Sequence, residues 1–241
     1  MAENREYQKA IDYLCGLIEE KKISIGDRLP TERKMAETLS IGRNSTREAL
    51  KMLEKLGMVE SRQGSGNYLA ANMSGTISKC IEMMILLNQT SQEEVIAFRR
   101  ELDFIICKEI ISKDTVPRWE NQLKNILTVE WGSLSHDEQV ELDREIHFTL
   151  IQASENSLWI CIAEAIASVY RKWIDCAIGQ AEQDVLRRMQ NTHYEMVSAL
   201  LERDLQRCEK AINTHYDLID GAFGLQPDNK TGGKIQVVAI K

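Results

Sequence analysis

The sequence predicts a mostly α-helical protein, with an N-terminal winged helix-turn-helix domain followed by an all-α helical bundle. Two observations lead to this prediction. Residues 25–69 follow the order helix, tight turn, helix and glycine-tipped hairpin. From residue 76 to residue 222, apolar residues recur at helical spacing, and no alternating apolar and polar run interrupts them. A chain of 241 residues with 43% hydrophobic residues is long enough to bury the cores of one large or two modest domains.

The elements of the first domain follow from spacing and capping signals. Residues 5–21 place four apolar side chains on one face of a first helix: Tyr7, Ile11, Leu14 and Ile18. Thr31 suits the N-cap of a second helix. Ser45, with Glu48 three residues later, predicts a capping box that opens a third helix, and Gly57 ends it. Residues 58–62 and 67–69 then flank a glycine-rich tip and form the hairpin.

The third helix has two distinct faces at about 100° per residue. One face is basic and carries Arg43, Arg47, Lys51 and Lys55, whereas the opposite face is expected to pack through Ala49, Met52, Leu53 and Leu56. A basic face on an isolated helix is usually solvated surface. Here it begins with two arginines at the helix N-terminus, beside small hydrogen-bonding side chains, which is what contacts in a DNA major groove require.

The chain divides by composition at a small-residue linker, residues 70–75. We expect helices near 76–87, 90–112, 116–130, 136–153, 156–178, 182–202 and 204–222. The predicted domains are a DNA-binding domain (1–72), a linker with a short helix (73–91), an all-helical domain (92–223) and a tail (224–241). The β-prone run 235–240 in that tail has no assigned role.

Charge and cysteine content constrain the class of protein. The net charge of −7 is unfavourable for DNA binding, but residues 1–72 hold 12 basic and 11 acidic residues, so the acidic excess lies elsewhere. Six cysteines without a Cys-x-x-Cys pair indicate buried thiols in a reducing compartment. The N-terminus lacks the apolar stretch of a signal peptide, and the longest apolar run, 83–87, is too short to cross a bilayer. We expect a cytoplasmic protein with no membrane contact.

Three of the four histidines fall on inward faces of the predicted helices. They are His147, His193 and His215, and Asp143 lies one turn before the first of them. A single inward histidine is usually a satisfied core residue. Burying four polar side chains in one apolar bundle costs several kcal/mol unless they converge on a partner, and a divalent cation is the natural one. Imidazole-rich ligation with one carboxylate suits zinc, nickel, cobalt or manganese. His136 is expected to be exposed.

The first domain resembles the GntR-type bacterial transcription regulators over residues 26–68. The resemblance rests on two motifs at the right separation, Gly26-Asp27-x-Leu29-Pro30-Thr31-Glu32-Arg33 and Arg43-x-x-x-Arg47-Glu48-Ala49-Leu50. It implies that the basic helix reads DNA. Gly42 stands where the family usually has Ser or Thr, so a hydroxyl contact to phosphate is lost there.

The second domain resembles the FCD ligand-binding domain of the FadR-type branch. Residues 142–148 and 153–156, with two later histidines, carry this resemblance. It implies that a metal held by Asp143, His147, His193 and His215 helps to bind a small carboxylate. The resemblance also points to Arg99 as an effector-binding residue; a structural ion pair with a bundle carboxylate is the alternative for this arginine.

Together these observations predict a metabolite-responsive regulator, acting as a repressor and as a homodimer on a pseudo-palindromic operator in double-stranded DNA. The expected DNA contacts are Arg33, Arg43, Asn44, Ser45, Arg47, Gln63 and Gly64. Two alternatives stay open. A metal-dependent hydrolase is disfavoured because no further inward histidine remains to act as a base. A constitutive DNA-binding protein with a purely structural metal would show no response to organic acids.

Overall fold

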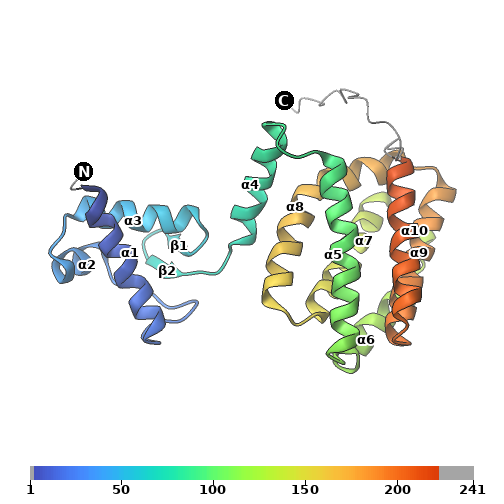
Figure 1. The fold of residues 1–241 in the computed structure, drawn as a ribbon, viewed down its shortest axis with the longest axis horizontal. Helices are drawn as coiled ribbons and strands as arrows, with labels where there is room; N and C mark the ends of the chain where they lie inside the picture. The colour runs from blue at the N-terminus through green and yellow to red at the C-terminus, as the bar shows by residue number, and fades with distance from the viewer. Residues whose placement is uncertain (1–2, 223–241) are drawn as a thin grey trace. The chain divides into compact units, whose positions relative to one another are not determined.

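The computed structural model describes residues 3–222, and within them the chain is helical apart from one small hairpin (Figure 1). The expected mostly α-helical fold is therefore confirmed. The described residues form two compact units, one comprising 3–89 with 164–169, the other comprising 90–163 and 170–222. The tail 224–241 and its run 235–240 lie outside the described residues. Within the described part of the chain, no helix combines the length and apolar character that a membrane crossing needs.

The first unit contains a three-helix core with a hairpin. Its elements are α1 (Glu3–Glu19), α2 (Glu32–Leu39), α3 (Arg43–Lys55), β1 (Val59–Arg62), β2 (Gly66–Leu69) and α4 (Ser74–Leu86). Helices α1 and α2 both pack against α3, and the strands pair antiparallel from Val59 opposite Leu69 to Arg62 opposite Gly66. The core side chains come from all of these elements except α4 and include Leu14, Met35, Leu50 and Leu53. This core fixes the exposed face of α3.

The N-terminus of α3 differs from the predicted capping box. Helix α3 begins at Arg43, and its N-cap is Gly42, which has no side chain to cap with. The hydroxyl of Ser45 instead donates to the carboxylate of Glu6 on α1 (2.8 Å), and the same carboxylate accepts the N–H of Gly42 (3.2 Å). A carboxylate from a neighbouring helix thus accepts the N–H of the N-cap residue, which is the role of the N3 carboxylate in a capping box. The predicted cap of α2 is confirmed, because Thr31 accepts the N–H at position 34 (3.2 Å).

The buried stripe of α3 is narrower than predicted. Met52 and Leu56 are 41% and 40% exposed, so the expectation that both pack inward was wrong. Ala49, Leu50 and Leu53 form the buried side instead. The helix ends as expected before Gly57, whose φ of +74° favours glycine and where an added Cβ would lie 2.0 Å from the carbonyl oxygen of residue 72.

The second unit is built from long helices around one apolar core. Its elements are α5 (Gln92–Ser112), α6 (Val116–Leu127), the 3-10 turn η1 (Trp131–Ser133), α7 (His136–Ala153), α8 (Ser157–Gln180), α9 (Gln183–Leu201) and α10 (Leu205–Ala222). Residues 164–169 of α8 group with the first unit. Helix α10 packs against α9 and α5, and α6 packs against α9 and α7. Helix α6 ends at Leu127, before the predicted 130, and the short η1 turn follows it. The other helices lie close to their predicted bounds.

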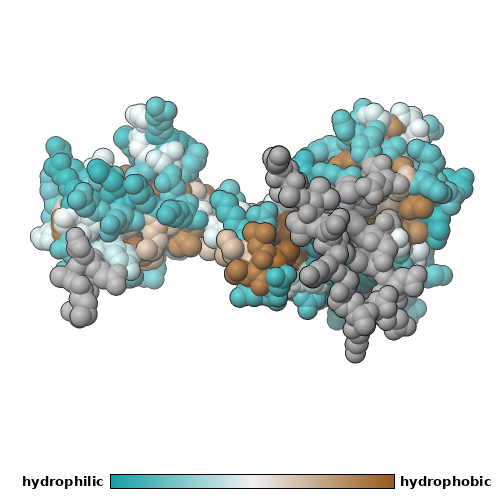
Figure 2. All heavy atoms as spheres, turned by 90° about the horizontal axis from the view of Figure 1, so that it is seen from above, coloured by the Kyte–Doolittle hydropathy of each residue, from teal (hydrophilic) through white to brown (hydrophobic). Residues whose placement is uncertain are grey.

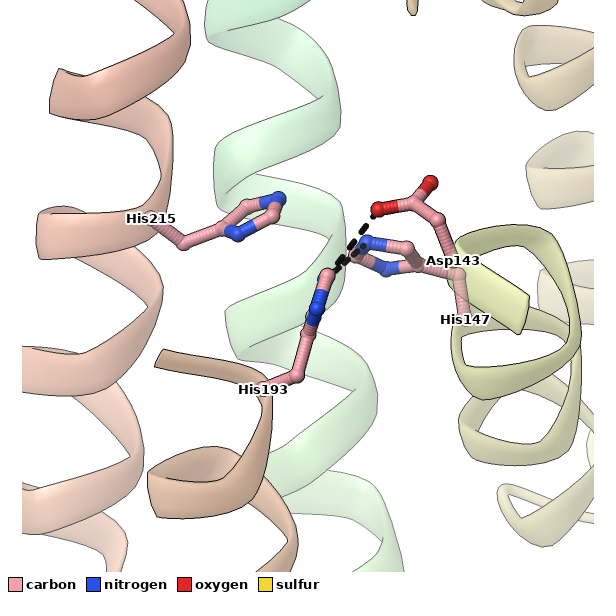
Figure 3. Close-up of side chains that lie close together, drawn as sticks. All are labelled: Asp143, His147, His193 and His215. Carbon is pink, nitrogen blue, oxygen red and sulfur yellow. Dashed lines mark hydrogen bonds and ion pairs between the residues drawn. The ribbon is translucent and has the colours of Figure 1, made fainter. Parts of the chain in front are cut away.

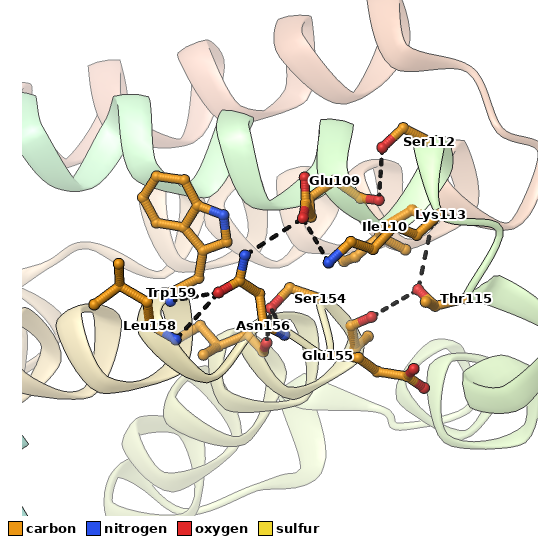
Figure 4. A network of polar contacts seen from close by, with 12 residues as sticks. Glu109, Ile110, Ser112, Lys113, Thr115, Ser154, Glu155, Asn156, Leu158 and Trp159 are labelled. Carbon is orange, nitrogen blue, oxygen red and sulfur yellow. Dashed lines mark hydrogen bonds and ion pairs between the residues drawn. The ribbon is translucent and has the colours of Figure 1, made fainter.

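A polar network fixes the turn between α7 and α8 on the end of α5 (Figure 4). The side-chain oxygen of Asn156 accepts the N–H groups of Leu158 (3.1 Å) and Trp159 (3.3 Å), which caps α8. The amide nitrogen of Asn156 lies 3.4 Å from the carboxylate of Glu109, and that carboxylate also pairs with Lys113 (2.7 Å). The network holds α7 in place beside α5, and α7 carries half of the cluster described next.

Candidate metal centre and nucleic-acid interface

Four ionisable side chains meet inside the second unit (Figure 3). Asp143 and His147 lie one turn apart on α7, His193 comes from α9 and His215 from α10. All four are buried, and one potential ligand atom from each lies within 4.8 Å of the others. The structure therefore brings together the whole set that the histidine pattern predicted, whereas His136 is exposed at the start of α7.

The potential metal-ligand atoms of the cluster face one another. The Nε2 atom of His193 lies 3.3 Å from Oδ1 of Asp143 and 3.4 Å from Nε2 of His147. The rings of His193 and His215 are 4.4 Å apart, measured between centroids. Oδ1 of Asp143 is buried and has no hydrogen-bond partner among the described residues. A buried carboxylate oxygen that faces imidazole nitrogens is costly by itself and is satisfied by a shared cation.

The tautomer of His215 follows from its neighbour on α9. The hydroxyl of Thr192 donates to the carbonyl of Met189 (2.6 Å). The Thr192 oxygen is therefore left to accept a hydrogen bond from Nδ1 of His215 at 3.1 Å. This assignment comes from the hydrogen-bond network. It leaves the lone pair of His215 on Nε2, the nitrogen that a metal ion would use.

Burial controls the charge of these groups. Burial and the nearby His147 lower the pKa of His193 well below its ordinary value of 6.5, and burial and then His193 do the same to His215. Both imidazoles are therefore neutral at pH 7, which is the form that binds metals. Burial also raises the pKa of the Asp143 carboxyl. The cluster fits a divalent cation, since it offers neutral nitrogens and one carboxylate oxygen.

Arg99 lies in a second buried network beside the cluster. Its Nε lies 3.1 Å from Oδ1 of Asp103, one turn further along α5, and 3.3 Å from the hydroxyl of Tyr216. Its Nη1 donates to the carbonyl of Ala163 (3.4 Å). Burial is the largest single influence on the Asp103 carboxyl and raises its pKa, but the guanidinium of Arg99, His147 and the hydroxyl of Tyr216 together outweigh burial and hold that pKa well below its usual range. The predicted alternative for Arg99, an ion pair with a bundle carboxylate, is present.

Three side chains that contact these groups have no role predicted from the sequence: Asp103, Thr192 and Tyr216. Asp103 was visible only as the acidic end of an Arg-x-x-x-Asp spacing, which places both side chains on one helical face. Thr192 directly precedes a predicted ligand, and Tyr216 directly follows one. The contacts of Asp103 with Tyr216 and His147, and of Thr192 with His215, depend on how α5, α7, α9 and α10 pack, so no local signal could have identified these contacts.

In the first unit, the predicted DNA contacts lie on α2, α3 and the hairpin tip. Arg33, Arg43, Asn44 and Arg47 are exposed, as are Gln63 and Gly64 in the β1–β2 turn. Arg47 pairs through Nε and Nη2 with the carboxylate of Glu32, the shorter contact measuring 2.8 Å. Ser45 does not fit its predicted contact, because it is buried and its hydroxyl donates to Glu6. We therefore leave Ser45 out of the interface.

Comparison with known families identifies both parts of the chain. The family described as bacterial regulatory proteins, gntR family, matches residues 6–69, and the FCD domain family matches residues 94–218. The chain is similar to the HTH-type transcriptional regulator LutR of Bacillus subtilis, with 24% identity over 224 residues, covering 86% of this chain and 98% of the relative. It is also similar to the Uxu operon transcriptional regulator of Escherichia coli, with 25% identity, covering 88% of this chain and 84% of the relative.

A solved structure shows the same fold. The structure titled Streptococcus agalactiae GntR matches with a TM-score of 0.63 at 21% sequence identity, covering 90% of this chain and 99% of that one. At this level of identity the match concerns the arrangement of helices and strands only.

Proposed function

This chain belongs to the gntR family of bacterial regulatory proteins, in the branch with an FCD domain, and is a DNA-binding transcription regulator rather than an enzyme. From this premise we propose that it is a cytoplasmic repressor that senses a small carboxylate through a metal ion in its helical domain. The observation that carries the proposal is the buried convergence of Asp143, His147, His193 and His215.

In this proposal the four side chains hold one divalent ion, with zinc, nickel, cobalt and manganese as the candidates. Three nitrogens and one oxygen would leave a position for an effector carboxylate on an ion that takes more than four ligands. When bound, the ion supplies a Lewis acid to which a carboxylate oxygen can attach. Arg99 supplies the second positive charge for the same anion, at the expense of part of its pairing with Asp103.

The first domain, which we place at residues 1–72, binds the operator in this proposal. Arg43, Asn44 and Arg47 at the start of α3 enter the major groove, because they are exposed and can donate to base edges and phosphates. Arg33 contacts the backbone, and Gln63 and Gly64 at the hairpin tip approach the minor groove. The bidentate contact with Glu32 holds the guanidinium of Arg47 in a fixed direction.

We propose that residues 92–223 also dimerise. The segment 73–91, which contains α4, connects this domain to the DNA-binding domain and takes part in the dimer. Hydrophobic side chains gather on the surface over α4 (Figure 2). Met83, Leu86 and Leu87 are 54%, 71% and 59% exposed, which a single copy leaves facing water. A second copy would cover them and would give the two-fold symmetry of a pseudo-palindromic operator. Sedimentation of the full chain should give a dimer, and sedimentation of the Leu86→Glu variant should give a monomer. A monomeric wild type would contradict the proposed dimer.

The metal and DNA sites share no residue, so an effector can act on DNA binding only through a coupling free energy, typically about 1–3 kcal/mol. Such coupling needs an element with two arrangements. We place it in residues 70–75 and α4, because this segment connects the proposed domains. For a repressor, the carboxylate then favours the arrangement that does not match the half-site spacing.

The test is an operator titration of the full chain, loaded with metal, with and without each member of a panel of small mono- and dicarboxylic acids. We expect one acid to weaken wild-type binding by about 5- to 150-fold. His193→Ala should bind the operator but ignore that acid, whereas the control His136→Ala should respond like wild type because His136 is exposed. A His193→Ala variant that responds normally would make this histidine a core residue. No response in the wild type would favour a constitutive DNA-binding protein with a structural metal.

A further inference from the structure

The carboxylate of Asp103 joins three helices beside the proposed metal centre. Asp103 is buried on α5. Its Oδ1 pairs with Nε of Arg99 at 3.1 Å on the same helix. Its Oδ2 accepts the hydroxyl of Tyr216 on α10 (2.7 Å) and lies 3.2 Å from Nδ1 of His147 on α7. Both oxygens of one side chain are thus committed to groups that surround the cluster.

The two ring nitrogens of His147 face in different directions. Nε2 faces the cluster, 3.4 Å from Nε2 of His193, while Nδ1 faces Asp103. A histidine that binds a metal through Nε2 must carry its proton on Nδ1, and a carboxylate acceptor for that proton fixes the tautomer and the ring orientation. The Nδ1–H direction lies off the line to Asp103, so Nδ1 has no aligned hydrogen-bond partner among the described residues. Forming that hydrogen bond over the 3.2 Å separation requires the imidazole ring to rotate.

We infer that Asp103 is a positioning residue for the metal centre: it holds the Nδ1 proton of His147 and so presents Nε2 to the ion. This inference rests on the proposed function, because it takes the cluster as a metal site. The same carboxylate is the counter-ion of Arg99, so it also ties the orientation of one metal ligand to the guanidinium proposed to bind the effector. Asp103 itself is not one of the four converging ligands.

The first test is the Asp103→Asn variant of the full chain, titrated with Zn²⁺ and separately with Co²⁺ in competition with a chromophoric chelator. Asparagine keeps an oxygen that can accept from Tyr216, but it has no charge and is a weaker acceptor for His147. We expect metal affinity to fall about 10- to 100-fold, as is typical when an outer carboxylate partner of a ligand histidine is lost. Long-range proton–nitrogen NMR of the loaded wild type should show the proton of His147 on Nδ1. A wild type with that proton on Nε2 would overturn the inference.

The matched control is Tyr216→Phe, which removes the other donor to the same oxygen and keeps the ring in place. Metal affinity should stay within about threefold of wild type, because the contact between Asp103 and His147 remains. A loss equal to that of Asp103→Asn would show that any disturbance of this network weakens the metal. The specific role of Asp103 would then be wrong.

Asp103→Asn leaves the guanidinium of Arg99 buried without its counter-charge, which can unfold the bundle. The double variant Arg99→Met, Asp103→Asn removes both charges and separates the two effects. We expect it to fold and still to bind metal 10- to 100-fold more weakly than wild type. Wild-type affinity in the double variant would mean that Asp103 serves only as the counter-ion of Arg99. A wild type that binds neither Zn²⁺ nor Co²⁺, and neither nickel nor manganese in the same competition assay, would defeat the proposed function as well. Equal affinities of wild type and Asp103→Asn would defeat this inference alone.

Discussion

Acid should destabilise the metal-free protein in a way that the buried histidines determine. His193 and His215 are 0% and 1% exposed, and their pKa values lie well below 6.5 in the folded chain. The unfolded chain takes up a proton on each of them as the pH falls below about 6.5, whereas the folded chain does not. Their contribution to stability is therefore complete above that pH and is lost below it. The contribution of each histidine to the unfolding free energy falls by about 1.4 kcal/mol between about pH 7.5 and pH 5.5, and the contribution of the pair falls by about 3 kcal/mol.

The assay is urea unfolding of the chelator-treated full chain, followed by helical circular dichroism at several values within this pH window. Asp143 has the opposite sign, because its raised pKa favours the folded state below its ordinary value of 3.8 and that contribution is lost as the pH rises. The His136→Gln control should show the same pH dependence as wild type, since His136 is exposed. An unfolding free energy that stays constant from pH 7.5 to about pH 5.5 would refute the buried, neutral state of the two histidines.

Three further predictions concern single substitutions. Arg43→Ala should weaken operator binding by about 1–3 kcal/mol and relax the preference at one base pair per half-site, as measured on a set of operator variants; uniform weakening would assign Arg43 to phosphate. Gly57→Ala should lower the thermal unfolding midpoint, because φ is +74° and the new Cβ would meet the carbonyl of Asn72 at 2.0 Å; an unchanged midpoint would contradict this clash. Thr115→Ala should cost about 1 kcal/mol in urea unfolding by removing the buried bond to the carbonyl of Ala153 (2.6 Å), and no loss would show that this bond is replaced.

Much of the fold could be predicted because its determinants are local. The inward faces of the long helices follow from apolar spacing, and the N-cap at Thr31 and the reversal at Gly57 follow from residue type. The capping box at Ser45 and Glu48 satisfied the same local rule and was still wrong. The hydroxyl of Ser45 donates to Glu6, 39 residues away in the chain, and no local pattern shows this contact. Helical spacing also set the inward direction of α3, but the packing of its neighbours set how wide the buried stripe is.

The candidate site was predictable for the opposite reason: its residues are chemically rare in a core. Three histidines and an aspartate on apolar faces need a common partner, so their convergence could be expected without knowing the helix packing. The surroundings could not be predicted in this way. Asp103 and Tyr216 are 113 residues apart and meet only because α10 packs against α5. An ion pair of Arg99 with an unspecified bundle carboxylate was one of two expectations, and helix packing decided that Asp103 is the partner.

The most direct test of the central claim, a metal centre made by four side chains, is the metal content of the full chain at equilibrium. Chelator-treated protein would be dialysed against zinc, nickel, cobalt or manganese in turn, and the bound ion would be counted per chain by elemental mass spectrometry. We predict one ion per chain for wild type and for His136→Ala with at least one of these metals. His193→Ala, checked for helical content, should retain none. A wild type that binds none of the four metals, or a folded His193→Ala that still binds one ion per chain, would contradict the claim.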